Sequence, residues 1–238
     1  MFFIPKENVA EGVGFQTFGF AHLLWILASV VLCVGACIFY KKLSEGKQKT
    51  MLRALGLCIL LQEIVRDVVL LVLGRFTWEH LPFHLCGINI LLVAFDMFKP
   101  TKIVRNFLYY FAIPGAALAL LFPNWTALPL WNFFNINSFT VHILLVMYPL
   151  LLVTTEQVSD DLMSAAKSIG LLVVMAVPVY GLNLLWNTNF MFLMKPESGN
   201  PLELFEKIFG SHLWGFPILL PVVVLIMYLP VGIFKKKR

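Results

Sequence analysis

Long apolar stretches recur along the whole chain, and short polar connectors separate them. A helix needs about 20 residues to cross the hydrocarbon core of a bilayer, and each stretch approaches that length. We predict seven membrane-spanning helices, at residues 18–40, 52–73, 81–98, 103–122, 138–155, 165–186 and 212–234. No soluble domain fits between them. The predicted fold class is an all-α, polytopic membrane protein in which residues 1–238 form a single transmembrane domain.

Two other segments complete the predicted layout. The longest connector, 187–211, is interrupted by Pro and Gly and has room for a short interfacial helix around 203–209. Residues 1–17 contain one lysine, two acidic residues and no short apolar core followed by a cleavage site. We therefore expect the first span to be retained as a helix rather than removed as a signal peptide.

Loop lysines and arginines predict the orientation, because cytoplasmic loops are enriched in them. The basic residues of one side are Lys41, Lys42, Lys47, Lys49, Arg53, Lys99, Lys102, Arg105, Lys167, Lys235, Lys236, Lys237 and Arg238. Those of the other side are Lys6, Arg75, Lys195 and Lys207. The N-terminus is therefore expected outside and the C-terminus inside.

Composition agrees with a membrane location, since 60% of the residues are hydrophobic and only 13% are charged. The net charge of +5 follows from the basic inner loops and their contact with anionic lipids. It does not indicate nucleic-acid binding. Membrane lipids are the expected partners, no cofactor is expected, and the sequence leaves the oligomeric state open. Compact loops suit a bacterial plasma membrane.

All five histidines fall at or near the outer ends of the predicted helices, as do Cys86 and Asp67. An ionisable side chain within a span costs roughly 2.5–3.5 kcal/mol on insertion scales, so it normally faces the bundle interior. Helical rise places Cys86 and His142 roughly 8 and 6 Å below the outer surface, and Glu63 at about 15 Å. The histidines are His22, His80, His84, His142 and His212. Their shared depth predicts a functional site.

Glu63, Arg66 and Asp67 are spaced i, i+3, i+4 in the second span and therefore share a helix face. Arg66 can pair with both carboxylates, which is how a bundle tolerates such groups. One interpretation is an ion-pair staple between helices. The other is that Glu63 or Asp67 orients a neighbouring histidine.

The head of the third span holds His84, Cys86 and Asn89. Cys86 and Asn89 share a face, whereas His84 and Cys86 diverge by about 200° on a regular helix. The two can point at one atom only if the helix start is distorted, which Pro82 and Gly87 would permit. His142, from another helix, is therefore the preferred partner of Cys86. The alternative is that Cys86 merely fills space in the packing.

His142 stands alone in an apolar helix, where it is either a hydrogen-bonded core histidine or a catalytic base. If it pairs with Cys86, the two residues predict nucleophilic catalysis by a thiol. A thiol needs an adjacent imidazole to supply thiolate at neutral pH, and Cys, His and an orienting polar group form a minimal nucleophilic set.

The other cysteines, Cys33, Cys37 and Cys58, lie in apolar helix interiors and are interpreted as small hydrophobes. No Cys/His spacing typical of a metal site is present. Several histidines share a depth, so a metal site stays an alternative, but only His80 and His84 have ligand-like spacing. We expect no metal.

Two segments carry a resemblance to known families. Residues 80–86, HLPFHLC, and residues 187–196, NTNFMFLMKP, resemble a bacterial YwaF-like seven-helix family. The layout is also similar to a eukaryotic seven-helix acyltransferase that remodels ether phospholipids. Further matching stretches are residues 83–95, 117–123 and 138–151, together with 187–189 and His212. In the eukaryotic pattern a histidine follows the cysteine, where this chain has Gly87. The resemblance implies that Cys86 and His142 form a catalytic pair.

The leading functional hypothesis is therefore a thiol-dependent lipid acyltransferase, or an acyl-lipid hydrolase, working near the outer leaflet through a thioester on Cys86. Glu63, Asp67 or Asn89 would orient His142, and Asn183, Asn187 or His212 would donate to the oxyanion. The alternative is a small-solute or lipid transporter or binding protein with a histidine-lined polar cavity. A third interpretation is an assembly partner of a larger membrane complex.

Overall fold

The computed structural model describes residues 2–159, 161–196 and 201–235, and no strand occurs among them. The long helices are α1 (Phe20–Lys41), α2 (Glu45–Val72), α3 (Leu85–Phe98), α6 (Phe133–Thr154), α7 (Leu162–Trp186) and α9 (Gly215–Lys235). Shorter elements are η1 (Lys6–Asn8), η2 (Trp78–His80), α4 (Lys102–Phe107), η3 (Leu108–Ala112), α5 (Ile113–Leu121), η4 (Phe190–Phe192), α8 (Pro201–Phe209) and η5 (His212–Trp214).

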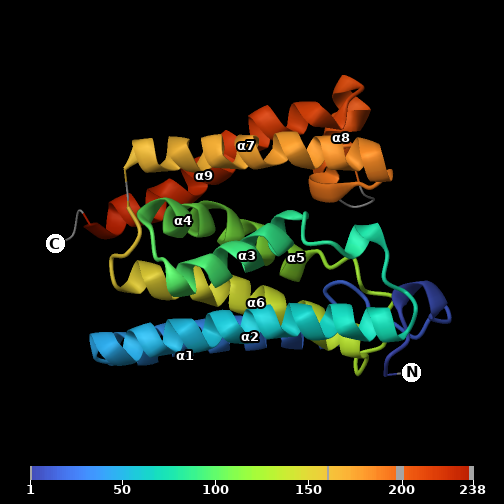
Figure 1. Cartoon of the computed structure of the whole chain (residues 1–238), viewed down its shortest axis with the longest axis horizontal. Coiled ribbons are helices and arrows are strands. Elements are labelled where there is room, and N and C mark those ends of the chain that lie inside the picture. The colour runs from blue at the N-terminus through green and yellow to red at the C-terminus, as the bar shows by residue number, and fades with distance from the viewer. Residues whose placement is uncertain (1, 160, 197–200, 236–238) are drawn as a thin grey trace.

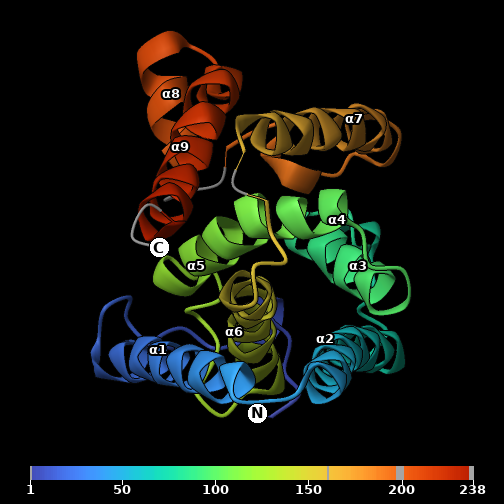
Figure 2. The same cartoon turned by 90° about the vertical axis from the view of Figure 1, so that its left-hand side faces the viewer.

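The helices lie roughly along one direction in three layers (Figures 1 and 2). One outer layer holds α7, α8 and α9, the middle layer holds α3, α4 and α5, and α6 lies below it between α1 and α2. We call the end of the bundle at which α2 ends and α3 begins the Cys86 end. The opposite end, at which α3 ends and α4 begins, is the Asp96 end.

Four helical runs are long and apolar enough to cross a membrane: α1, Lys102–Leu121, α6 and α7. The α8–α9 pair, bent by 118°, makes a fifth if the two helices form one span. Two predicted spans fall outside this set. The α2 helix carries Glu63, Arg66 and Asp67 within its apolar part, and α3 has only 14 residues. The described residues thus form an all-helical protein with four or five candidate spans.

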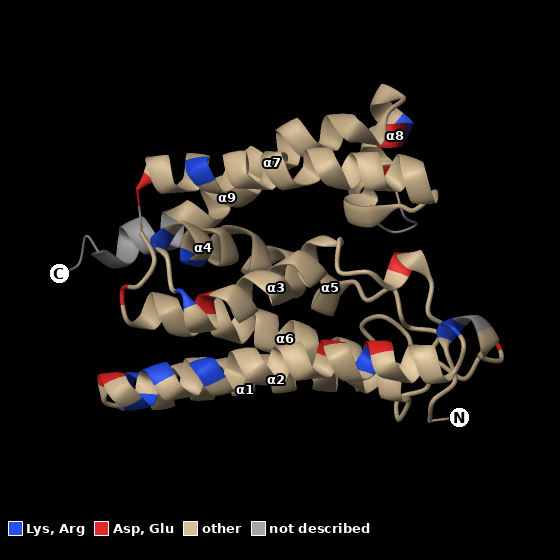
Figure 3. Cartoon of the chain, in the orientation of Figure 1, with Lys and Arg blue, Asp and Glu red and all other residues tan. Residues whose placement is uncertain are grey.

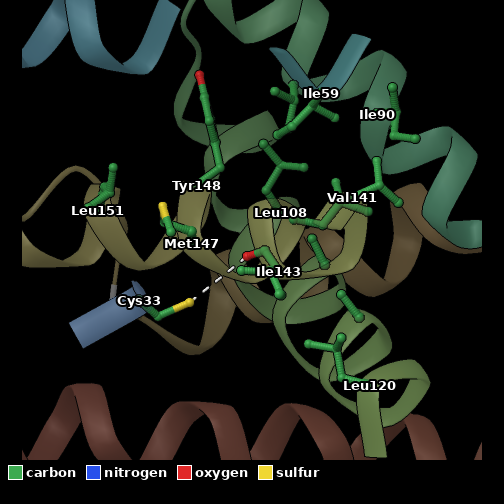
Figure 4. Packing of buried hydrophobic residues seen from close by; sticks show 14 of the residues in the cluster. Cys33, Ile59, Ile90, Leu108, Leu120, Val141, Ile143, Met147, Tyr148 and Leu151 are labelled. Atoms are coloured by element: carbon green, nitrogen blue, oxygen red, sulfur yellow. Dashed lines mark hydrogen bonds between the residues drawn. The ribbon is translucent and has the colours of Figure 1, made fainter. Parts of the chain in front are cut away.

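The α6 helix is the centre of the packing. In the most apolar window of α6, 56% of the residues are buried, against 17% for α1, which lies at the periphery. Figure 4 shows α6 side chains such as Val141, Ile143 and Tyr148 among Ile59 of α2, Ile90 of α3 and Leu108 of η3. The outward faces of α1 and α2 expose Leu, Val and Ile side chains, an apolar surface that a lipid environment accommodates.

The predicted fourth span is one helical run, Lys102–Leu121, with a π-helical segment, Leu108–Ala112, in its middle. Pro114 follows directly and cannot donate a backbone hydrogen bond, which favours such an irregularity. The five π-helical residues are all buried. The segment packs against α3 and α6, the two helices that carry Cys86 and His142.

The predicted interfacial helix around 203–209 is present as α8. It is strongly amphipathic, with Leu204 and Ile208 exposed on the side away from the bundle. A sharp bend follows before α9, where Glu206 accepts hydrogen bonds from the backbone N–H of His212 at 2.8 Å and contacts its Nδ1 at 3.0 Å.

Basic residues gather at the Asp96 end of the bundle, over the first turns of α2 and α4 (Figure 3). Asp161, one of the acidic residues at this end, is the N-cap residue of α7. Its Oδ1 and Oδ2 accept hydrogen bonds from the backbone N–H and the hydroxyl of Ser164, both at 2.7 Å. These bonds hold the pKa of Asp161 below its usual range.

Candidate functional site

The charged face of α2 forms one ion-pair group at the Cys86 end, which we call the Arg66 group (Glu63, Arg66 and Asp67). Nη2 of Arg66 lies 2.8 Å from Oε1 of Glu63 and 2.7 Å from Oδ1 of Asp67. It also donates to the carbonyl oxygen of His80 at 3.0 Å. The predicted pairing of Arg66 with both carboxylates is confirmed, and the guanidinium also ties α2 to the segment that precedes α3.

Cys86 lies in the first turn of α3 and is partly exposed. Its side chain packs against the central buried cluster, which includes Val141 and Ile143, the chain neighbours of His142. The Cys86 side chain therefore contacts the interior of the helix bundle.

The start of α3 differs from the prediction. The helix begins at Leu85, not at residue 81, so Pro82 and His84 lie outside it and helical rise cannot be counted from His80. Residues 81–84 fold back over the first turn. A Cβ at Gly87 would lie 2.7 Å from Cα of Pro82, closer than side chains approach a backbone. Gly87 is thus required for this fold-back.

His84 is the N-cap residue of α3 and has an extended backbone, so it lies outside the helix that carries Cys86. Its Nδ1 accepts a hydrogen bond from the backbone N–H of Met191 at 3.3 Å. Its ring also contacts Phe190 and Phe192, with centroid distances of 5.3 and 5.6 Å. His84 therefore anchors the loop after α7, in agreement with its predicted divergence from Cys86.

His142 projects from α6 and is partly exposed. Its Nδ1 lies 2.6 Å from the carbonyl oxygen of Ser138, one helical turn earlier. A carbonyl oxygen only accepts, so Nδ1 carries the proton and Nε2 is left as the acceptor of the neutral ring. The ring stacks on Trp125, with centroids 5.3 Å apart and planes 21° apart.

The group that orients His142 is therefore not one that the sequence predicts. Glu63 and Asp67 are engaged with Arg66. Neither amide atom of Asn89 has a hydrogen-bond partner within the part of the chain that the structure describes. The backbone carbonyl of Ser138 and the indole ring of Trp125 hold the imidazole instead. A backbone acceptor carries no side-chain signal, so the residue pattern could not indicate it.

Asn183 has a structural role in place of the predicted donor role. Its Oδ1 accepts from the hydroxyl of Thr188 at 2.9 Å and from the backbone N–H of Phe190 at 2.8 Å, and its Nδ2 donates to the Phe190 carbonyl at 3.0 Å. The amide closes the loop after α7. Asn187 is exposed and ends α7 in a left-handed conformation with φ of 52°. That position favours asparagine for backbone reasons.

Two other histidines are also held by local contacts. His212 is 6% exposed and pairs with Glu206 of α8, so its contacts lie at the α8–α9 bend rather than in the Arg66 group. His22 accepts from the backbone N–H of Phe18 at 2.8 Å and bonds through Nε2 to the carbonyl of Leu120 at 2.7 Å. Its ring thus joins α1 to the end of α5.

A second polar cluster at the Asp96 end was missed by the sequence analysis. Asp96 of α3 is 2% exposed and accepts from Nε of Arg105 at 3.0 Å and from the hydroxyl of Tyr148 at 3.0 Å. Arg105 also donates to Oε1 of Gln157. The cluster joins α3, α4, α6 and the connector after α6. Its members lie far apart in sequence, so no spacing could indicate it.

An apolar groove of about 490 Å³ runs between α2 and α6. Its lining residues are Phe2, Ala54, Leu57, Cys58, Leu61, Gln62, Val65, Phe133, Ile136, Asn137 and Thr140. Within the groove, the hydroxyl of Thr140 donates to Oε1 of Gln62 at 2.6 Å. The exposed side chains that line the groove on α2 include Leu57, Leu61 and Val65, so the groove is suited to a hydrocarbon chain.

The structure thus places a thiol in the first turn of α3 and an imidazole on α6, and these two helices pack against each other and against α2. The described residues contain no group of three or more His, Cys, Asp or Glu side chains arranged to hold a metal ion.

An all-helical chain with four or five apolar helices of spanning length defines an integral membrane protein. The sequence model of the TMEM164 family matches residues 17–228, and the chain belongs to this family. Comparison with curated proteins and with solved structures finds no match. The family assignment covers the helices that carry Cys86, His142 and the Arg66 group.

Proposed function

We propose that this protein is a membrane-embedded, thiol-dependent lipid acyltransferase or acyl-lipid hydrolase. The observation that carries the proposal is the state of His142. Its Nδ1–H is donated to Ser138, so Nε2 is the basic atom of a partly exposed ring. Cys86 lies on α3, which packs against the helix that carries His142. The pairing of sulfur and imidazole is part of the proposal.

In the first step the Cys86 S–H proton moves to Nε2 of His142 while sulfur bonds to the carbonyl carbon of an acyl ester. The C=O electron pair shifts to oxygen and returns as the ester C–O bond breaks. The leaving alkoxide takes the proton from Nε2. The products are a thioester on Cys86 and a lysolipid.

In the second step a hydroxyl of an acceptor lipid, or water, attacks the thioester carbonyl. His142 takes the proton of the attacking hydroxyl and returns it to the departing sulfur as the C–S bond breaks. A lipid acceptor gives an acyl transfer, and water gives hydrolysis. The groove between α2 and α6 would hold the acyl chain.

The proposed topology has seven spans, with the N-terminus outside and the C-terminus inside. The paired charges on α2 reduce the cost of placing that helix in lipid. With 14 residues, α3 is about 21 Å long, so residues 77–84 would occupy the outer part of the layer. Cys86 would then lie below the headgroups of the outer leaflet. The basic Asp96 end (Figure 3) supports this orientation, and a bacterial plasma membrane is the proposed location.

The decisive experiment is intact-mass analysis of the detergent-purified protein after incubation with phospholipid. We expect one acyl adduct on Cys86 and none in Cys86→Ala. Cys37→Ala is the matched control, because Cys37 is a partly exposed thiol of α1 that does not line the groove, and it should keep the adduct. If Cys86→Ala retains full acyl turnover, the proposal is wrong. A protein that moves lipids or solutes without forming any adduct would instead be the transporter.

A further inference from the structure

Asn89, one turn beyond Cys86 on α3, has a buried side-chain amide that makes no hydrogen bond with the described residues. The residue is 1% exposed. Neither Oδ1 nor Nδ2 has a hydrogen-bond partner among the residues that the structure describes. Buried polar side chains are normally satisfied, so each exception requires an explanation, such as a catalytic role or an ordered water.

Asn183 provides a comparison for the unpaired amide of Asn89. Both asparagines are 1% exposed and lie within helices. Asn183 uses both of its amide atoms to close the loop after α7. Burial alone therefore need not leave an asparagine of this protein unpaired. Among the described residues, Asn135 lacks a partner only at Oδ1, whereas Asn89 lacks one at both amide atoms.

The position of Asn89 relative to the thiol is fixed by helix geometry. Residues three apart share a helix face, with Cβ atoms about 5–6 Å apart. Val93 follows on this face and is fully buried in the central cluster. Because α3 packs against α2 and α6, the face that carries Cys86 and Asn89 belongs to the bundle interior. A carbonyl bonded to the sulfur would lie within reach of the amide.

We infer that Asn89 is a catalytic residue that donates a hydrogen bond from Nδ2 to the carbonyl oxygen of the acyl group attacked by Cys86. This inference rests on the proposed function. When sulfur bonds to the carbonyl carbon, the C=O electron pair moves onto oxygen, and the Nδ2–H stabilises that charge without giving up its proton. A fixed donor in a water-poor site is effective because it requires no reorganisation as charge develops.

Asn89 takes the oxyanion-donor role that the sequence analysis gave to Asn183, Asn187 or His212. The sequence analysis had instead assigned Asn89 to orienting His142. Asn183 is occupied by the loop, and His212 is bound at the α8–α9 bend. Asn89 combines burial, an unpaired N–H and a place on the nucleophile's own helix face.

The test compares Asn89→Leu with the wild-type protein in the rate of acyl-adduct formation on Cys86. Loss of one oxyanion donor slows such reactions by roughly 10²–10³-fold, and we expect a loss of that size. Alkylation of Cys86 by N-ethylmaleimide, followed by peptide mass mapping, should stay at the wild-type rate. Asn89→Ala also removes the donor and adds no ionisable group, so it should lose about as much and serves if the leucine variant is not recovered.

Thermal unfolding gives an independent readout with a matched control. Asn89→Leu removes an unsatisfied amide and should unfold at or above the wild-type temperature, whereas Asn183→Leu should unfold at a lower one. Wild-type adduct formation in Asn89→Leu, with Cys86→Ala inactive, would overturn the inference and leave the proposed function intact. A parallel fall in maleimide reactivity would also overturn it, since Asn89 would then act on the thiol. Full turnover in Cys86→Ala would remove the proposed function itself.

Discussion

Nδ1 of His142 lies 2.6 Å from the carbonyl oxygen of Ser138 on the same helix. The orientation of the ring is thereby set within α6, and it does not depend on a carboxylate from a neighbouring helix. Trp125 supports one face of the ring. An imidazole fixed in this way has a defined basic atom even if the surrounding helices shift slightly.

Replacing this imidazole should remove the chemistry and spare the fold. We expect His142→Gln to reduce acyl-adduct formation on Cys86 to background, because glutamine cannot take the thiol proton. His212→Gln is the matched control, since that histidine contacts Glu206 and should leave adduct formation near the wild-type level. Intact-mass spectra of both variants check the prediction, and equal losses in the two would contradict it.

The close approach of Pro82 to Gly87 predicts a sensitive position next to the thiol. Gly87→Ala places a Cβ 2.7 Å from Cα of Pro82, so the segment before α3 must move. Overpacking of this kind costs about 1–3 kcal/mol, and we expect lower thermal stability together with slower adduct formation.

Gly181 in α7 provides the comparison for that substitution. A Cβ there meets nothing within 4 Å among the described atoms. Gly181→Ala should therefore be neutral or stabilising by about 0.5–1 kcal/mol, because glycine is unfavourable in a helix interior. Thermal denaturation in one detergent measures both variants. Equal destabilisation of the two would refute the close contact.

The buried ion pair at the Asp96 end should contribute strongly to stability. Asp96→Ala leaves Arg105 and the Tyr148 hydroxyl without their shared partner. Breaking a buried pair from one side costs about 3–5 kcal/mol. Lys207→Ala, which removes the exposed pair with Glu203, should cost no more than about 1 kcal/mol. Unfolding midpoints of the two variants check the difference, which should vanish if the Asp96 cluster is solvated.

Filling the groove between α2 and α6 should change the acyl chains that the protein accepts. Ala54 and Val65 lie eleven residues apart along its wall, about 17 Å of helix. Ala54→Trp shortens that space, so we expect a shift of the Cys86 adducts toward shorter chains when mixed-chain phospholipids are supplied. Val174→Trp, on the exposed face of α7, is the control. An unchanged adduct distribution would exclude the groove as the chain site.

Hydropathy located the helices, because burial in lipid demands long apolar runs whatever their packing, but only four or five of the seven predicted spans are long and apolar enough among the described residues. The runs at 103–122 and 165–186 match Lys102–Leu121 and Leu162–Trp186 closely. The start of α3 was wrong by four residues. Pro82 is compatible with a first helical turn, and only the tertiary fold-back onto Gly87 decides against it.

Prediction of the candidate site was less complete, for a physical reason. Spacing within one helix identified the Arg66 group, since i, i+3 and i+4 positions must share a face. Contacts between helices have no such signature. Asn183 and His212 were therefore assigned to a shared site, although Asn183 is bonded within its own loop and His212 is held through Nδ1 at the α8–α9 bend. The roles of Cys86 and His142 remain predictions.

The π-helical turn at Leu108–Ala112 has a consequence for how the chain can vary. One surplus residue rotates everything that follows by roughly 100° relative to a regular helix. Deleting a single residue there would restore a regular α-helix. It would also rotate the carbonyl of Leu120 away from the ring of His22. Insertions and deletions in this stretch are therefore coupled to the packing of α1, although Leu120 and His22 are 98 residues apart in the sequence.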